Sequence, residues 1–299
     1  MLAMKVWWLG TAGEWLIINF LKGGRICQNT LMGKSNSVMR RLLSLAVIFS
    51  FINLQGAAAA SLGELSHIHN IRVHQNKIFL GTHEGLYQYF SPTKVVKIKP
   101  DSFDVMGLAT NQSTLFASGH PGVNSKFAQP VGVLSSADNG VTWKQVSLKG
   151  EVDFHMLEVG KADMYGVDSG KGELMYSANL GKSWSSRGIN TYSDIAIDSS
   201  KAGLAFGLKN GQIYKSTDSF KSAKIIKSKL AFSAIELVGK RFYGVSGSNL
   251  YLSTNGAASW ATLATFDKSI GVISTSESML LVAAGDKILI SKDLGKSFK

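Results

Sequence analysis

The sequence predicts an all-β fold built from a repeated unit, and three observations support this. A polar turn motif recurs with a nearly constant period, short strand-like runs lie between its copies, and helical periodicity is essentially absent after residue 60. A period near 40 residues with several strands per repeat is typical of a radial β array. We therefore predict that residues 61–299 form a single six-bladed β-propeller.

The repeated motif is a Ser-x-Asp/Asn hairpin turn followed by a large aromatic residue. Its leading serines fall 41, 39, 37 and 38 residues apart, and the copies span 136–143, 177–184, 216–220, 253–260 and 291–298. The Asp or Asn side chain can accept hydrogen bonds from backbone N–H groups of the turn, and glycine permits the positive φ that the turn needs. The aromatic residue returns to the sheet as an apolar wedge. The motif predicts a structural staple rather than a catalytic group.

Between the turns, the chain divides into six units of short strands that we letter a to d. The a strands are expected at 67–73, 105–110, 154–159, 194–197, 233–238 and 271–274. Only three strands are evident in the last unit. Either residues 61–66 supply its fourth strand, or the last blade has three strands, because a ring must close without a long open edge.

The first 60 residues do not belong to the repeats. A basic start at 39–41 is followed by an apolar run at 42–54, which is too short to span a bilayer comfortably, and by small residues at 56–60. This pattern predicts a signal peptide over residues 39–60, with cleavage after Ala60, and an uncleaved anchor is the alternative. Residues 1–38 show no targeting pattern, so we expect them to be a mis-assigned extension upstream of a start at Met39. The expected location is periplasmic or extracellular.

Composition restricts the partners. Residues 1–60 contain six of the 32 Lys and Arg residues and one of the 20 acidic residues, so the rest has 26 basic against 19 acidic side chains, a net charge of +7. The basic residues are mostly single lysines in turns and on alternate strand positions, which does not favour nucleic-acid binding. The only cysteine is Cys27, so no disulfide supports the propeller. We expect a monomer without a membrane span after cleavage.

The turns resemble those of the Asp-box (BNR) repeat β-propellers, which include sialidases, sortilin-type receptor propellers and photosystem II assembly-factor-like proteins. Further segments resemble a bacterial exported, glycosyl hydrolase-like subfamily of this group, and they span 66–69, 82–86, 117–121, 152–155 and 168–170. The resemblance covers residues 66–299. It implies the fold but little about activity, because one fold hosts many functions.

The catalytic residues of sialidases do not carry over to this sequence. The Arg-Ile-Pro motif of that family is absent, and the arginines after residue 60 are Arg72, Arg187 and Arg241, the last two expected in outer or intermediate strands. No Tyr–Glu nucleophile pair can be assigned. We therefore favour a non-catalytic binding or assembly module for a protein or a small polar or glycan ligand. A glycoside hydrolase with two suitably spaced carboxyl groups is the alternative.

The repeats can be compared with one another, because a structural position should look alike in all six units. Two residues before the first apolar residue of the a strands lie His69, Met106, His155, Ser193, Ser233 and Ile270, and two further back lie His67, Asp104, Asp153, Thr191, Ala231 and Lys268. The b strands of the first three units end at His83, His120 and Asp168. Five of the six histidines therefore fall on equivalent positions of units one to three, and His74 is expected to be a turn residue.

These positions should meet at one face of the propeller, beside the central channel. We expect metal ligation by His67, His69, His83, His120 and His155, with Asp153 beside them, and Asp104, Met106 and Asp168 completing or supporting the ligand set. Imidazole and carboxylate donors suit zinc, and an added thioether admits copper. Two other interpretations remain open: a polar ligand pocket without metal, and histidines that only bind backbone and water.

Overall fold

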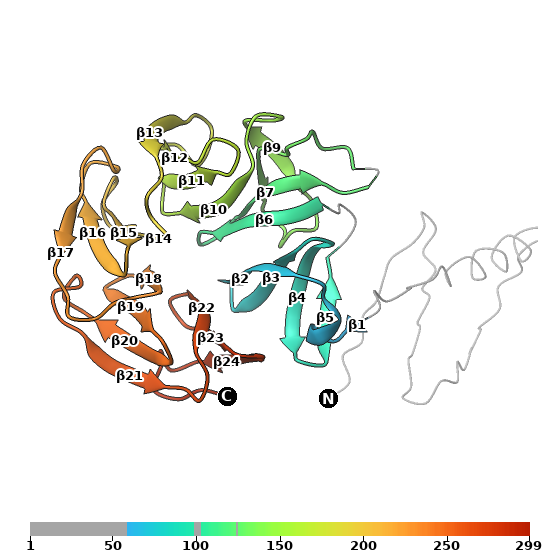
Figure 1. The fold of residues 1–299 in the computed structure, drawn as a ribbon. Coiled ribbons are helices and arrows are strands. Elements are labelled where there is room, and N and C mark those ends of the chain that lie inside the picture. Colours follow the sequence, from blue (N-terminus) through green and yellow to red (C-terminus); the bar gives the residue numbers. More distant parts are fainter. Residues whose placement is uncertain (1–58, 99–102, 124) are drawn as a thin grey trace, which may run out of the picture. The chain divides into compact units, whose positions relative to one another are not determined.

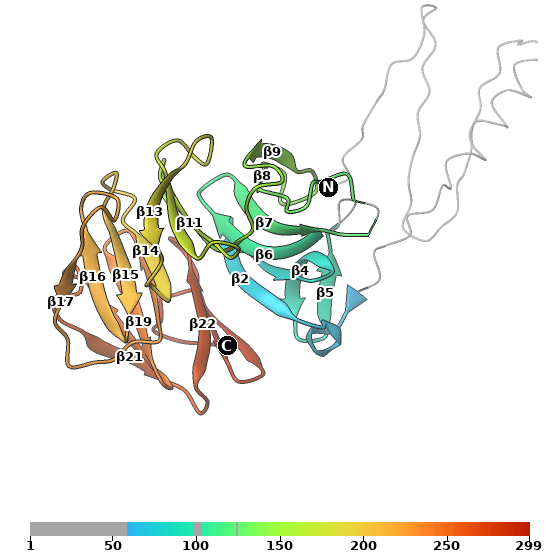
Figure 2. The ribbon, with the colours of Figure 1, turned by 45° about the horizontal axis from the view of Figure 1, so that its top comes forward.

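The computed structural model describes residues 59–98, 103–123 and 125–299, and the regular secondary structure of these residues is almost entirely β-strand. Six antiparallel sheets stand around a central axis as the blades of a β-propeller, as the turn period predicts (Figure 1). Figure 2 shows the same blades from a tilted direction. The expected extension over residues 1–38 and residues 39–58 of the expected signal peptide lie outside the described residues. No helix in the described part is long and apolar enough to cross a membrane.

The strands are as follows. Blade 1 contains β2 (Ile68–His74), β3 (Lys77–Thr82), β4 (Gly85–Ser91) and β5 (Lys94–Lys97). Blade 2 contains β6 (Phe103–Thr110), β7 (Leu115–Pro121), β8 (Val133–Ser136) and β9 (Lys144–Ser147). Blade 3 contains β10 (Phe154–Val159), β11 (Met164–Asp168), β12 (Glu173–Ser177) and β13 (Ser185–Ile189). Blade 4 contains β14 (Asp194–Ile197), β15 (Ala205–Lys209), β16 (Gln212–Ser216) and β17 (Lys224–Ile226). Blade 5 contains β18 (Ala234–Val238), β19 (Arg241–Ser246), β20 (Asn249–Ser253) and β21 (Ala261–Thr265), and blade 6 contains β22 (Ile270–Thr275), β23 (Leu280–Ala284) and β24 (Lys287–Ser291).

Of the two alternatives for the last blade, the structure shows a blade of three strands, and residues 61–66 do not join it. These residues include the short 3₁₀ helix η1 (Leu62–Glu64), whose Leu62 N–H donates to the Pro92 carbonyl at 2.8 Å, beside blade 1. The preceding strand β1 (Ala59–Ala60) also joins blade 1, pairing antiparallel with β5. Blade 6 has three strands, and Lys299 exchanges two backbone hydrogen bonds with Ile290 at its edge.

The ring closes by side-chain packing between blades 1 and 6. Buried Val73 and Leu80 of blade 1 share an apolar cluster with Met279 and Leu281 of blade 6. The backbone N–H of Val73 also donates to the buried Ser274 hydroxyl at 3.0 Å. Burial of several large aliphatic side chains contributes about 1.5–3 kcal/mol each, so apolar contact alone can hold this junction.

The Ser-Asp turns close through the same hydrogen bonds in every copy. In the first copy, the Ser136 hydroxyl accepts from the Gly140 N–H at 2.8 Å and donates to Asp138 at 2.7 Å, and Asp138 accepts from the Thr142 N–H at 2.9 Å. The degenerate copy keeps this pattern although it has no glycine. There Phe220 occupies the glycine position, adopts φ 58° and lies buried, and Ala223 stands at the tryptophan position.

The tryptophan wedges differ in depth. Trp143 is 5% exposed and packs edge-on against Phe103 in the core between blades 1 and 2. Trp184 and Trp260 are less deeply buried than Trp143. Trp184 keeps its Nε1–H near the surface, where it donates to the Gly181 carbonyl at 2.9 Å.

Candidate functional site

The starts of the a strands and the ends of the b strands meet at one face of blades 1 to 3. Each of β2, β6 and β10 has an irregular pairing with its b strand at the same place, and the residues at these bulges are His69, Met106 and His155. A bulge places one extra residue in a strand and redirects its side chain. The three predicted equivalents therefore share one local backbone feature. In blade 6 the bulge falls on Gly271, whereas the comparison of the repeats gave the preceding residue, Ile270, as the equivalent position.

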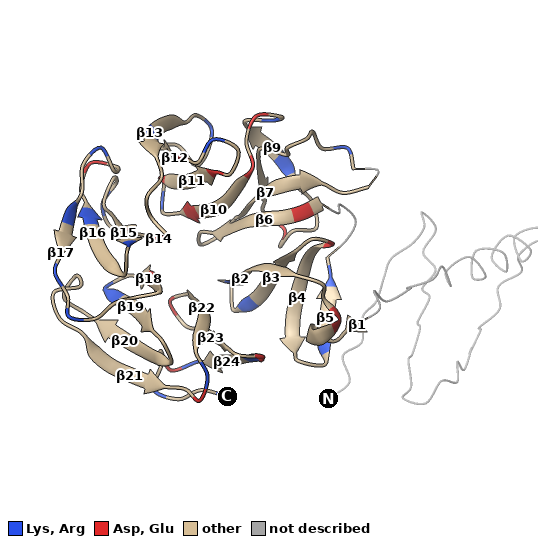
Figure 3. Cartoon of the chain, viewed as in Figure 1, with Lys and Arg blue, Asp and Glu red and all other residues tan. Residues whose placement is uncertain are grey.

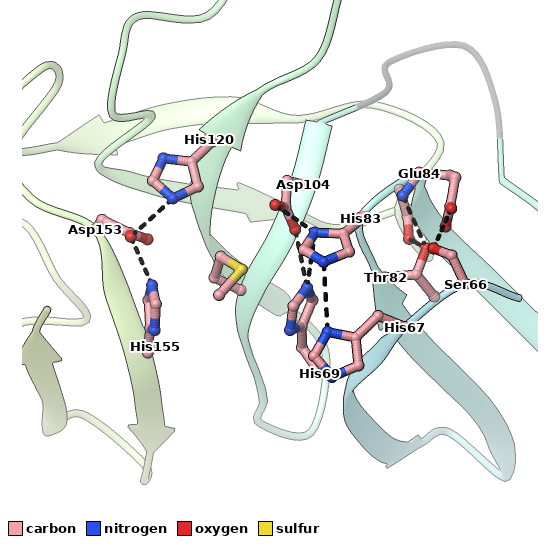
Figure 4. A network of polar contacts seen from close by, with 12 residues as sticks. Ser66, His67, His69, Thr82, His83, Glu84, Asp104, His120, Asp153 and His155 are labelled. Atoms are coloured by element: carbon pink, nitrogen blue, oxygen red, sulfur yellow. Dashed lines mark hydrogen bonds and ion pairs between the residues drawn. The ribbon is translucent and has the colours of Figure 1, made fainter.

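The first group of donor atoms contains His67, His69, His83 and Asp104 (Figure 4). The Nε2 atom of His69 lies 3.2 Å from both His83 Nδ1 and Asp104 Oδ1, and His83 Nδ1 lies 2.8 Å from Asp104 Oδ2. His67 Nδ1 lies 3.4 Å from the other nitrogen of His83. One nitrogen from each of the three histidines lies within 4.8 Å of the other two.

The second group contains His120, Asp153 and His155. Asp153 Oδ2 lies 3.1 Å from His120 Nε2 and 2.7 Å from His155 Nε2, and it accepts a hydrogen bond from the Ser169 hydroxyl at 3.0 Å. Gln129 holds the opposite nitrogen of His120 at 3.0 Å. The other carboxylate oxygen of Asp153, Oδ1, is buried and has no hydrogen-bond partner.

The two groups repeat one arrangement across successive blade junctions. His83 ends the b strand of blade 1 and meets Asp104 at the start of blade 2, and His120 ends the b strand of blade 2 and meets Asp153 at the start of blade 3. The third member is the bulge histidine of blade 1 in the first group and of blade 3 in the second. Each group is thus assembled by blade packing and not within one hairpin.

The spacing of these atoms fits tetrahedral coordination. With metal–nitrogen distances of 2.0–2.1 Å, neighbouring ligands of a tetrahedral zinc site lie about 3.3 Å apart. The donor separations around His69 and Asp104, 2.8 to 3.2 Å, are close to this value. Burial lowers the pKa of His69, as do His83 and His67, while Asp104 raises it. The net lowering favours the neutral imidazole that a metal ion requires.

Accessibility differs within the groups. The His83, His120 and His155 side chains are 49%, 38% and 46% exposed, whereas Asp153 is 9% exposed. The carboxylates therefore form the floor of the site, and imidazoles at its rim face solvent. A solute can reach them without a conformational change.

Three other residues singled out in the sequence lie outside these contacts. Asp168 is buried and caps the turn after β11 by accepting the Gly170 N–H at 3.0 Å. Met106 lies at the bulge of β6, where its carbonyl accepts from Asn70 at 2.6 Å. His74 is buried at the end of β2 and hydrogen-bonds Thr110.

Sequence reasoning missed Gln129 and Ser169. Both lie in loops beside the second group, and neither belongs to a repeated position. Ser169 belongs to the segment 168–170 that resembles the exported subfamily, but no signal marks Gln129, because an isolated Gln in a loop is common. Their role follows only from the contacts to His120 and Asp153.

The opposite end of the channel contains a separate polar cavity of about 790 Å³. Arg72 extends from β2, pairs with Glu158 of β10 and donates through Nε to the Leu108 carbonyl at 2.8 Å. Burial raises the pKa of Glu158 to about 8 and that of Glu236 to about 7, with Arg72 opposing both shifts. Burial likewise raises the pKa of Asp194 to about 6.

The arginines do not form a carboxylate clamp. Arg72 lies in the channel, Arg187 lies on the outer strand of blade 3 and donates to the Ser219 carbonyl at 2.6 Å, and Arg241 pairs with Glu277. Over the described blades, Lys and Arg are spread along several strands and turns (Figure 3).

No family model and no curated protein matches this chain. Solved structures similar to it include the GH74 enzyme of Niastella koreensis, with TM-score 0.53 and 16% identity over 78% of this chain and 37% of that one. PorZ, a surface component of the type-IX secretion system of Porphyromonas gingivalis, has TM-score 0.54 and 13% identity, with coverage of 81% and 33%. A chain of the nidogen–laminin complex has TM-score 0.53 and 10% identity, with coverage of 76% and 90%.

This chain thus spans about a third of the GH74 and PorZ chains. At these identities, the likeness concerns the fold alone. Together with the six sheets around one axis, it establishes that residues 59–299 of this chain form a six-bladed β-propeller.

Proposed function

We propose that this protein is an exported, non-catalytic binding or assembly propeller of the Asp-box group, whose face over blades 1 to 3 binds a divalent transition metal. The observation that carries the proposal is the convergence of two sets of His and Asp donor atoms at adjacent blade junctions. Zinc is the metal that neutral imidazole and carboxylate donors at tetrahedral spacing suit best, and copper is the second candidate.

Three features support a binding role. The rim imidazoles are exposed, the propeller presents them on a rigid sheet framework, and sites on rigid elements hold their geometry well. A protein or a small polar or glycan ligand can then meet the metal from solvent. One solved structure with this fold belongs to a nidogen–laminin complex, which agrees with a protein-binding role for such a scaffold.

The test is metal analysis of protein purified without a histidine tag. We expect stoichiometric zinc or copper in the wild type and a lower content in His69→Ala and His155→Ala. Ser193→Ala, at the corresponding position of blade 4, is the control and should match the wild type. Zinc at 100 times its dissociation constant should stabilise the fold by about 2.7 kcal/mol. Metal content should fall as the pH is lowered, because protons compete with the metal ion for the imidazole nitrogens.

The absence of bound metal, together with no thermal stabilisation by zinc or copper, would overturn the metal assignment. A panel of chromogenic glycosides separates the binding role from the hydrolase alternative. Turnover that is abolished by Asp153→Asn would favour the hydrolase. N-terminal sequencing of the mature protein tests export and the expected cleavage after Ala60.

A further inference from the structure

The two donor groups differ in how many ligands the protein supplies. The first group offers three histidine nitrogens within 4.8 Å of one another, and Asp104 contacts two of these histidines, so up to four protein ligands are at hand. The second offers only His120, Asp153 and His155. Closed four-ligand sites are typical of structural zinc, whereas sites with three protein ligands keep a position for water or another ligand.

Two side chains beside the second group, Gln129 and Ser169, already form hydrogen bonds with its members and are not free to bind a metal ion. Gln129 contacts the Nδ1 atom of His120, on the far side of the ring from Asp153. The Ser169 hydroxyl donates to Asp153 Oδ2. The Ser169 contact orients Asp153 in the way that outer partners of metal sites do. Gln129 can do the same for His120 when its amide oxygen, and not its amide nitrogen, faces Nδ1, because a metal-ligating imidazole donates from its other ring nitrogen. Neither residue fills a coordination position.

The buried carboxylate gives an independent indication of a cation at this place. The Asp153 side chain is 9% exposed, and its Oδ1 atom has no hydrogen-bond partner among the described residues. Leaving such an atom buried and unsatisfied costs about 1–3 kcal/mol, and more when the group is charged. The histidine nitrogens gather at the other oxygen, Oδ2, so a metal ion that binds both carboxylate oxygens compensates that cost.

Charge and exposure then define what the open position accepts. A divalent ion with one carboxylate and two neutral imidazoles carries a net charge of +1, so a monoanionic oxygen donor neutralises it. The His120 and His155 side chains, 38% and 46% exposed, leave this position open to solvent. We propose that a divalent metal ion at His120, Asp153 and His155 keeps one coordination position open and binds a carboxylate-bearing ligand there. The inference rests on the proposed metal-binding function.

Cobalt substitution tests the proposal, because the visible absorption of Co²⁺ responds to its ligands. We expect two Co²⁺ ions per wild-type chain and a saturable spectral change on adding acetate. His120→Ala and His155→Ala should each bind one Co²⁺ and lose the acetate response. His69→Ala should also bind one Co²⁺ but keep the response. A short peptide with a free C-terminal carboxylate, compared with its C-terminal amide, distinguishes a peptide terminus from a small organic acid as the source of the carboxylate.

The outcomes separate this inference from the proposed function. If the wild type binds no Co²⁺, the metal-binding function is wrong and this inference falls with it. If two ions bind and acetate changes nothing, only the open position is wrong. An acetate response that persists in His120→Ala and His155→Ala but disappears in His69→Ala would assign the open position to the other group. Thermal unfolding of each metal-free variant checks that the fold is intact.

Discussion

Replacement of Arg72 by methionine should destabilise the propeller strongly at pH 8 and only weakly at pH 5. The Arg72 and Glu158 side chains are 15% and 17% exposed, and they join blade 1 to blade 3 across the channel. Glu236 and Asp194 lie close enough for the same guanidinium to oppose the rise in their pKa values. One cation therefore compensates three carboxyl groups.

The magnitude follows from the pKa values. Burial raises the pKa of Asp194 from 3.8 to about 6. A shift of about two units corresponds to about 3 kcal/mol, at 1.36 kcal/mol per unit. Because the folded-state pKa values of Asp194, Glu236 and Glu158 are raised, the folded protein binds more protons than the unfolded chain between about pH 4 and pH 8. Their contribution to stability is therefore fully present below about pH 4 and is lost as the pH rises toward 8.

Arg72→Met removes the cation while the carboxyl groups stay buried. At pH 8 this should cost about 3–5 kcal/mol, as expected for a buried ion pair that loses one partner. At pH 5 the carboxyl groups are largely protonated, so the loss should fall to about 1–2 kcal/mol, which reflects the lost hydrogen bonds. Adding Glu158→Gln to Arg72→Met should recover part of the stability at pH 8, because one uncompensated charge is removed.

Urea unfolding followed by tryptophan fluorescence at both pH values measures these differences. Arg241→Met is the matched control, because Arg241 pairs at 3.1 Å with Glu277, which is 72% exposed. A surface pair of this kind contributes about 0–1 kcal/mol, with little change between pH 5 and pH 8. Equal losses for Arg72→Met at both pH values would refute the reasoning.

Three further predictions concern the turns, the wedges and the site. Trp143→Ala should lower the free energy of unfolding by about 3–5 kcal/mol, and Trp184→Ala, at a half-buried position, by less; equal losses in chemical denaturation would contradict the difference in depth. Ser216→Ala should cost about 1–3 kcal/mol by the same measurement, because the Phe220 N–H loses its 2.8 Å acceptor in a buried turn, whereas Ser200→Ala in an exposed loop should change little. Gly119→Ala should weaken zinc binding at both groups, as measured by calorimetric titration. The added Cβ would lie 1.9 Å from the Asp104 carbonyl oxygen, so the start of β6 must move. An unchanged affinity for zinc would contradict this prediction.

The fold could be predicted because its repeated signal is local. Each Ser-Asp turn closes through hydrogen bonds between residues two to four positions apart, so the sequence pattern contains the whole interaction. The fifth strand of blade 1 is different. Ala59 and Ala60 pair with β5, about 36 positions along the chain, and two alanines provide no distinguishing pattern.

The channel charges could not be anticipated for a similar reason. A single Arg or Glu at an alternate position of a strand normally faces solvent. Arg72 and Glu158 point into the channel because all six a strands surround one axis, a consequence of ring closure and not of either strand alone. The pairing of each histidine with its aspartate also crosses a blade junction, so the strand register could select His83 and Asp104 but not their contact.

The residues equivalent to His69 and His155 in the other blades show what the fold itself requires at the site. In blades 4 and 5 they are Ser193 and Ser233, which precede β14 and β18, and these strands pair with β15 and β19 without a bulge. Their hydroxyls donate to the Leu208 and Val245 carbonyls at 3.2 and 3.4 Å. A serine is therefore sufficient to satisfy the backbone there, and in blade 6 a glycine at position 271 occupies the bulge. The fold therefore does not require the imidazoles of His69 and His155 in blades 1 and 3. Each of these imidazoles contacts an aspartate and a second histidine from a neighbouring b strand. Because packing does not demand these residues, their convergence supports the metal site proposed above.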